Sequence, residues 1–225
     1  MIENLNIGDM FSQLMVQYTA LFSIVNPLGS VFVFFAITRA FPLPDRERLA
    51  GRVGLYTWVM LLVSLFGGLY LLRFFGISFP VLRVAGGIVV ALTAWQLLTS
   101  SDDPKKSTLP SQAEGRDAAQ LAFYPLTMPL TIGPGSISVA ITLAANAPSN
   151  LPERLIASAI SALAVTLIAA TVYLCYRYAD RMTRLFGPTG TGIIVRISGF
   201  LLFCIGIQIF WFGAQELLRS LTQQP

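Results

Sequence analysis

The chain has 225 residues, of which 55% are hydrophobic and only 12% are charged. Soluble domains carry about 25% charged residues, so this composition excludes an ordinary water-soluble domain. The net charge of +4 at pH 7 does not indicate nucleic acid, because the basic residues cluster in short segments between apolar runs. Such clustering is typical of the loops that orient a membrane protein.

Six stretches of the chain lack Asp, Glu, Lys and Arg and are long enough to cross a membrane. A helix needs about 20 mostly apolar residues to span the hydrocarbon core. The stretches are 10–38, 53–72, 84–101, 118–152, 155–176 and 197–215, and we expect the third and sixth to begin a few residues earlier. The sequence therefore predicts an all-α integral membrane fold with six transmembrane helices, in a single membrane domain over 1–225.

The first and fourth stretches are too long for one crossing, and each has Pro and Gly near its middle. The first contains Asn26-Pro27-Leu28-Gly29, and the fourth contains Gly133-Pro134-Gly135. Proline removes a backbone donor and clashes with the preceding turn, and glycine permits the dihedral angles of a break. We therefore predict that the first and fourth helices are broken.

The basic residues predict the orientation. Ten of them lie in the first, third and fifth loops, and three lie on the opposite side of the membrane. The ten are Arg39, Arg46, Arg48, Arg52, Lys105, Lys106, Arg116, Arg177, Arg181 and Arg184, and the three are Arg73, Arg154 and Arg219. The positive-inside rule then places these three loops in the cytoplasm and both termini in the periplasm.

The two halves of the chain, 10–101 and 118–215, resemble each other. Residues 23–30 correspond to residues 130–136 around the two breaks, and 82–87 correspond to 195–200. Each half contains three crossings, so the second half runs through the membrane upside down relative to the first. The sequence thus predicts an inverted repeat, which in secondary transporters places the substrate near the midplane between broken helices.

The two predicted breaks form the candidate substrate site. A break offers unpaired N–H groups at the start of the second half-helix and carbonyls at the end of the first, and these can hold a zwitterion. The alternative is a pair of proline kinks with serine caps that only allow close packing. The candidate residues are Asn26, Pro27, Gly29, Ser30, Gly133, Pro134, Gly135 and Ser136.

The predicted spans lack the groups that catalysis and metal binding usually need. All eleven Asp and Glu residues lie in termini or loops, and the chain has no histidine. We therefore expect no enzyme activity, cofactor or metal site, and a small ligand without net charge. Arg83 and Arg196 lie close enough to span ends for their side chains to reach the interface, with a gating or ion-pair role as the alternative.

Several motifs in order resemble the MarC family of bacterial inner-membrane proteins. They are Asn26-Pro27-Leu28-Gly29, then Phe75-Gly76-Ile77-Ser78 leading to Leu82-Arg83-Val84-Ala85-Gly86-Gly87, and finally Pro125-Leu126-Thr127-Met128-Pro129-Leu130-Thr131-Ile132-Gly133-Pro134-Gly135. The resemblance covers nearly the whole chain. It implies an architecture similar to that of LysE-type exporters, a place in the bacterial inner membrane, and small neutral amino acids such as glycine or alanine as the transported class.

The residues and the resemblance together favour a secondary transporter of small neutral amino acids that works through the two broken helices. A channel or exporter for other small solutes and a non-transport membrane scaffold are the alternatives. The expected partners are the small solute and the lipid bilayer, without nucleic acid. The sequence leaves the direction of transport, the oligomeric state and the coupling ion open, with sodium and protons both compatible.

Overall fold

The structure, a computed structural model, describes residues 7–99 and 121–222, and in these ranges the chain forms helices joined by short turns, without a β-strand. The elements are α1 (Ile7–Val25), α2 (Pro27–Thr38), α3 (Leu43–Phe74), α4 (Phe79–Thr99), the π-helix η1 (Ala122–Thr131), α6 (Pro134–Ala145), α7 (Leu151–Arg177) and α8 (Ala179–Thr222). The whole predicted third loop, with Lys105, Lys106 and Arg116, lies outside the described residues. So do the end of the predicted third span at 100–101 and the start of the fourth at 118–120.

Among the described residues, the helices supply five candidate membrane spans, or six when a bent pair is counted as one. Five are long and apolar enough individually: Ile7–Thr38, which joins α1 and α2, then Leu43–Phe74, Phe79–Gln96, Leu151–Arg177 and Gly190–Arg219. The sixth is the pair η1 and α6, whose axes are bent by 67°. The prediction of an all-α membrane fold with broken first and fourth helices is therefore confirmed.

Two of the helices extend well beyond the predicted spans. The helix α3 begins at Leu43, ten residues before the predicted start at 53, and α8 begins at Ala179. Their extra turns carry charged residues such as Arg46 and Asp180, whose side chains form an ion pair of 3.1 Å. A search for uncharged stretches finds the part of a helix that fits the hydrocarbon, and it misses turns that continue into the polar interface.

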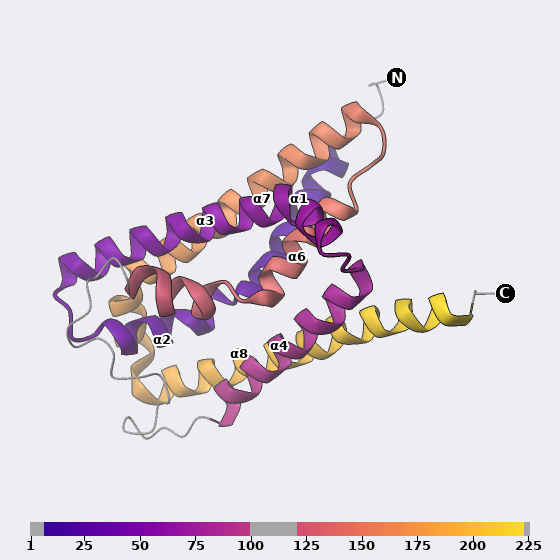
Figure 1. Cartoon of the computed structure of the whole chain (residues 1–225). Coiled ribbons are helices and arrows are strands. Elements are labelled where there is room, and N and C mark those ends of the chain that lie inside the picture. The colour runs from indigo at the N-terminus through magenta and orange to yellow at the C-terminus, as the bar shows by residue number, and fades with distance from the viewer. Residues whose placement is uncertain (1–6, 100–120, 223–225) are drawn as a thin grey trace.

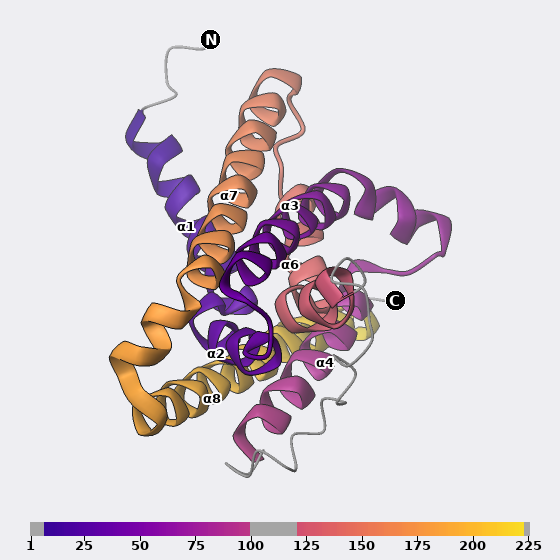
Figure 2. The same ribbon diagram turned by 90° about the vertical axis from the view of Figure 1, so that its left-hand side faces the viewer.

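The half-helices lie between two pairs of long helices. The helix α3 packs on α7, and α4 packs on α8, and these pairs form the upper and lower parts of Figure 1. Between them, α2 contacts α7 and α8, and α6 contacts α3 and α4 (Figures 1 and 2). Both breaks thus lie between packed helices, where irregular backbone at membrane depth is tolerated.

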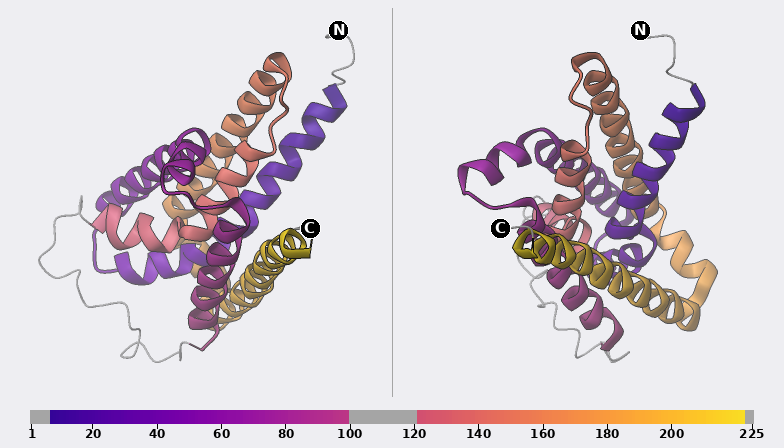
Figure 3. Two further views of the ribbon diagram at one scale, coloured as in Figure 1. Left: turned by 45° about the vertical axis from the view of Figure 1, so that its right-hand side comes forward. Right: turned by 90° about the vertical axis from the view of Figure 1, so that its right-hand side faces the viewer.

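Glycines bring the backbones of α4 and α8 into direct contact. A Cβ atom on Gly87 would lie 2.4 Å from the Phe210 nitrogen, and one on Gly206 would lie 2.6 Å from the Ala91 nitrogen. Higher residue numbers in α4 meet lower numbers in α8, so the two helices are antiparallel, and Figure 3 shows the pair from two further sides. Small residues allow this approach in membranes, where close packing replaces the hydrophobic effect between helices.

We expect Gly87→Ala to destabilise the protein by about 1–3 kcal/mol, the usual cost of overpacking, because the new methyl group would meet backbone atoms of α8. Gly67→Ala in α3 is the matched control, since a Cβ there meets nothing within 4 Å. It should be neutral or slightly stabilising, because alanine favours a helix over glycine. Thermal unfolding in detergent, followed by the helical circular dichroism signal, measures both. Equal unfolding temperatures would contradict the glycine contact.

Candidate functional site

The first break is built by Asn26, which adopts the left-handed conformation with φ 47° and ψ 58°. Asparagine tolerates these angles better than most residues. Its side-chain Oδ1 accepts a hydrogen bond from the Gly29 N–H at 3.2 Å, and its carbonyl accepts from the Ser30 N–H and hydroxyl, both at 3.0 Å. Pro27 has no N–H to satisfy. The start of α2 is therefore largely capped by the residue that breaks the helix.

The second break is built differently. Ile132 and Gly133 are both extended, with φ −116° and −101°, and α6 then starts at Pro134. The Gly133 carbonyl accepts from the Ser136 and Ile137 N–H groups at 3.0 and 3.2 Å. Glycine has no side chain, so no side-chain hydrogen bond caps the start of α6. This half-helix therefore begins without the capping group that Asn26 gives to α2.

The π-helix η1, which precedes the second break, repeats the pattern Pro-Leu-Thr. Its two prolines, Pro125 and Pro129, follow extended residues and interrupt the helical hydrogen bonds. Two buried threonines compensate: Thr127 Oγ1 donates to the Ala122 carbonyl at 2.6 Å, and Thr131 Oγ1 donates to the Leu126 carbonyl at 2.7 Å. Hydroxyl groups are suited to this, since they reach carbonyls that the irregular backbone leaves unpaired.

Tyr176, near the end of α7, connects the two broken helices. Its hydroxyl lies 2.8 Å from Thr131 Oγ1. Its ring stacks on Phe34 of α2 with centroids 4.4 Å apart, and the residue is 2% exposed. One buried side chain therefore contacts Thr131, which ends η1, and Phe34 of α2.

The predicted site residues are mostly buried at these two breaks. Pro27, Gly29, Ser30, Gly135 and Ser136 are buried, Asn26 and Gly133 are half-buried, and Pro134 is exposed. The breaks approach each other, since a Cβ on Gly135 would lie 3.6 Å from Ile24 Cδ1 at the end of α1.

In this structure the glycines at the breaks serve helix packing. A Cβ on Gly29 would lie 2.9 Å from Ser198 Cβ of α8, and one on Gly135 would lie 2.0 Å from Val90 Cγ2 of α4. Neither glycine lines the cavities described here and below. The assignment of these glycines to a substrate site stays a prediction, and the alternative of close packing has direct structural support.

The cavity nearest the second break lies between α4, α6 and α8 and has a volume of about 480 Å³. It is lined by Arg83, Ser138, Val139, Thr142, Ile209, Phe212, Gln215, Glu216 and Arg219. Ser138 follows Gly135 by one helical turn, is 1% exposed, and its Oγ has no hydrogen-bond partner among the described residues. A buried polar group without a partner is costly, so this hydroxyl is a candidate ligand contact.

Charged groups line another part of the same cavity. Arg83 Nη1 lies 2.9 Å from Glu216 Oε2, and the guanidinium lies over the Phe79 ring at 4.5 Å from its centroid. The Arg83 side chain is only 23% exposed, whereas Arg196 is exposed on α8. Arg83 is therefore held in an ion pair beside the cavity, and an interfacial role for either arginine stays a prediction.

Sequence reasoning missed three residues that the structure brings to this region: Thr131, Ser138 and Tyr176. The repeated Pro-Leu-Thr pattern contained a signal for Thr131, because a threonine after each proline suggests compensation of the broken backbone. Ser138 follows Ser136 by two residues and carried a weaker signal. Tyr176 carried none, since an aromatic residue at the end of a span is typical of the membrane interface.

Known proteins match almost the whole chain. The family model described as MarC family integral membrane protein matches residues 11–218. The inner membrane protein MarC of Salmonella typhimurium (strain LT2) is 30% identical over 220 residues, which are 94% of this chain and 98% of that protein. The protein of the same name from Escherichia coli O1:K1 is 29% identical over 217 residues, with the same coverage. No solved structure matches. The chain therefore belongs to the MarC family of integral membrane proteins.

Proposed function

We propose that the protein is a secondary transporter that moves small neutral amino acids, similar to glycine or alanine, across the inner membrane. The observation that carries the proposal is the buried Ser138 hydroxyl, which lacks a hydrogen-bond partner among the described residues and lines a cavity one turn beyond the second break. Transporter substrates are commonly held where a broken helix exposes its N-terminus.

The cavity lining suits a ligand that carries both charges and a small apolar part. The Ser138 hydroxyl, which has no hydrogen-bond partner among the described residues, can donate to a carboxylate. Glu216 offers a carboxylate to an ammonium group, and Arg83 and Arg219 add guanidinium groups that attract a carboxylate. Val139 and Phe212 supply apolar contacts. Such a lining offers partners to both charged ends of a small zwitterion.

The packing of the helices supports an inverted repeat, which remains part of the proposal. In such a repeat, α2, α3 and α4 correspond to α6, α7 and α8. The contacts then come in matched sets, because α3 packs on α7, α4 packs on α8, and α2 packs on α8 as α6 packs on α4. Alternating access follows if one pair of long helices moves against the other around the breaks. The coupling ion is left unassigned, with sodium and protons as the candidates.

Transport itself is tested with purified protein in liposomes. We expect labelled glycine and alanine to enter with saturation and to show counterflow, while sodium and pH gradients are varied separately. Flux without saturation would support the channel alternative, and absence of flux for any small solute would support the scaffold.

Ser138→Ala should raise the half-saturation concentration by roughly two- to tenfold, since one neutral hydrogen bond contributes about 0.5–1.5 kcal/mol. Ser64→Ala is the control, because the Ser64 hydroxyl donates to the Met60 carbonyl within α3 and lines neither cavity. Unchanged saturation in the Ser138 variant would remove this hydroxyl from the site.

Tyr176→Phe should lower the unfolding free energy by about 0.5–1.5 kcal/mol through loss of its hydroxyl contact with Thr131. Under the proposed mechanism it should also change the transport rate, since Tyr176 contacts both broken helices. Tyr18→Phe is the matched control, because the Tyr18 hydroxyl lies 3.0 Å from Thr171 Oγ1, between α1 and α7. If both variants lose stability and transport to the same extent, Tyr176 has no special role at the breaks.

The proposed orientation has both termini in the periplasm. A topology reporter fused after Pro225 should report the periplasm, and one inserted near Lys105 should report the cytoplasm, because basic residues concentrate in the loops of that side. Alkaline phosphatase and green fluorescent protein fusions provide the two readouts. The opposite result at both positions would reverse the orientation.

A further inference from the structure

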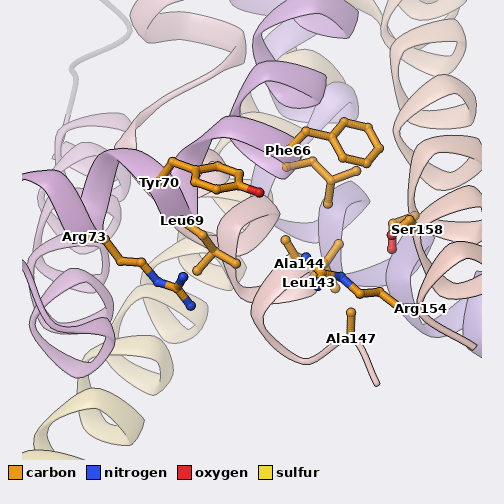
Figure 4. Close-up of a pocket in the computed structure, with 11 residues that line it drawn as sticks. Phe66, Leu69, Tyr70, Arg73, Leu143, Ala144, Ala147, Arg154 and Ser158 are labelled. Carbon is orange, nitrogen blue, oxygen red and sulfur yellow. The ribbon is translucent and has the colours of Figure 1, made fainter. Parts of the chain in front are cut away.

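A second cavity, of about 150 Å³, lies between α3, α6 and α7, and no residue of the proposed transport site lines it. Figure 4 shows Arg73 and Arg154 reaching into it from opposite sides, from the last turn of α3 and the first turn of α7. Tyr70 and Ser158 also line it, so hydroxyl groups accompany the two guanidinium groups.

These two arginines differ from most others in the protein because their side chains make no ion pair, hydrogen bond or aromatic contact within the described ranges. Other arginines there are held by carboxylates, as Arg46 is by Asp180 and Arg83 by Glu216. Glu153 precedes Arg154 in the chain but forms no ion pair with it. Both guanidinium groups therefore keep their donors available to a ligand.

Both arginines are exposed, so solvent screens their charges in part, and an anion in the cavity would interact favourably with both. Two positive charges face one small cavity, and like charges repel. Arg154 also lies in the first turn of α7, where the helix dipole is positive and disfavours a cation. An oxyanion would relieve both effects, and guanidinium groups bind phosphate oxygens in a bidentate manner.

We propose that this cavity binds the phosphate of an anionic phospholipid headgroup. Arg73 and Arg154 lie at the ends of the spans Leu43–Phe74 and Leu151–Arg177, at the depth where headgroups are found. Beside the cavity, Phe66 and Tyr70 of α3 are 51% and 69% exposed, which offers an apolar surface to the acyl chains. Basic pockets between membrane helices are known headgroup sites on the cytoplasmic side, and in the proposed orientation this cavity would be a comparable pocket on the periplasmic side. Free phosphate has the same chemistry but would leave this apolar surface unused.

The test uses the full-length protein, stripped of lipid in a neutral detergent. Phosphatidylglycerol, phosphatidylcholine and inorganic phosphate are added separately, and binding is followed by native mass spectrometry and by the unfolding temperature. We expect phosphatidylglycerol to bind and to raise the unfolding temperature more than phosphatidylcholine does. Equal effects of the two lipids would overturn the proposal. A shift with inorganic phosphate but not with phosphatidylglycerol would overturn the lipid as the source.

Variants locate the site. Arg73→Gln and Arg154→Gln should each weaken phosphatidylglycerol binding about tenfold, the usual effect of losing a charged hydrogen bond. Arg52→Gln is the matched control, because Arg52 is exposed, has the same charge and lines neither cavity. If a glutamine variant does not fold, Arg73→Lys and Arg154→Lys keep the charge and should bind more weakly through loss of the planar fork. Binding equal to that of the unmodified protein in all four variants would overturn the assignment.

Discussion

Every buried backbone N–H and C=O group in a membrane must find a partner inside the protein, since hydrocarbon offers none. Unbroken helices meet this requirement by themselves, whereas the breaks at Asn26 and Gly133 do not. Side chains around the breaks supply hydrogen bonds that the interrupted helices lack. The side-chain amide oxygen of Asn26 caps α2, and the hydroxyl groups of Thr127 and Thr131 donate to carbonyls of η1. The polar residues at this depth are therefore explained first by the backbone that they satisfy.

The same requirement makes the two breaks unequal. Asn26 occupies the start of α2, so little donor capacity is left there for a ligand. Gly133 leaves the start of α6 without a side-chain cap, and the unpaired Ser138 hydroxyl lies one turn further along, at the large cavity. The two halves of the chain look alike around their prolines, but the residue before the proline differs. Asn26 gives the next half-helix a side-chain cap, and Gly133 does not.

The sequence allowed the spans and both breaks to be predicted, because each depends on local chemistry: an uncharged run of sufficient length, or a proline beside a glycine. The contacts between breaks could not be predicted in this way. Tyr176 meets Thr131 across 45 residues of chain, and nothing in the local pattern distinguishes it from other aromatic residues at a span end. Likewise, Gly87 and Gly206 were recognisable as small residues, but their partner helix depends on the tertiary packing.

The close glycine contact between α4 and α8 has a consequence for the proposed transport. Helices that meet backbone to backbone have few side chains between them to rearrange, so this pair is expected to move as one body. The same pair contacts both half-helices, since Val90 of α4 packs at Gly135 and Ser198 of α8 packs at Gly29. A shift of the pair would therefore loosen both breaks together. Under the proposed function, the glycine packing seen here is then one of the arrangements between which the protein alternates, because the pair that would move also holds both half-helices.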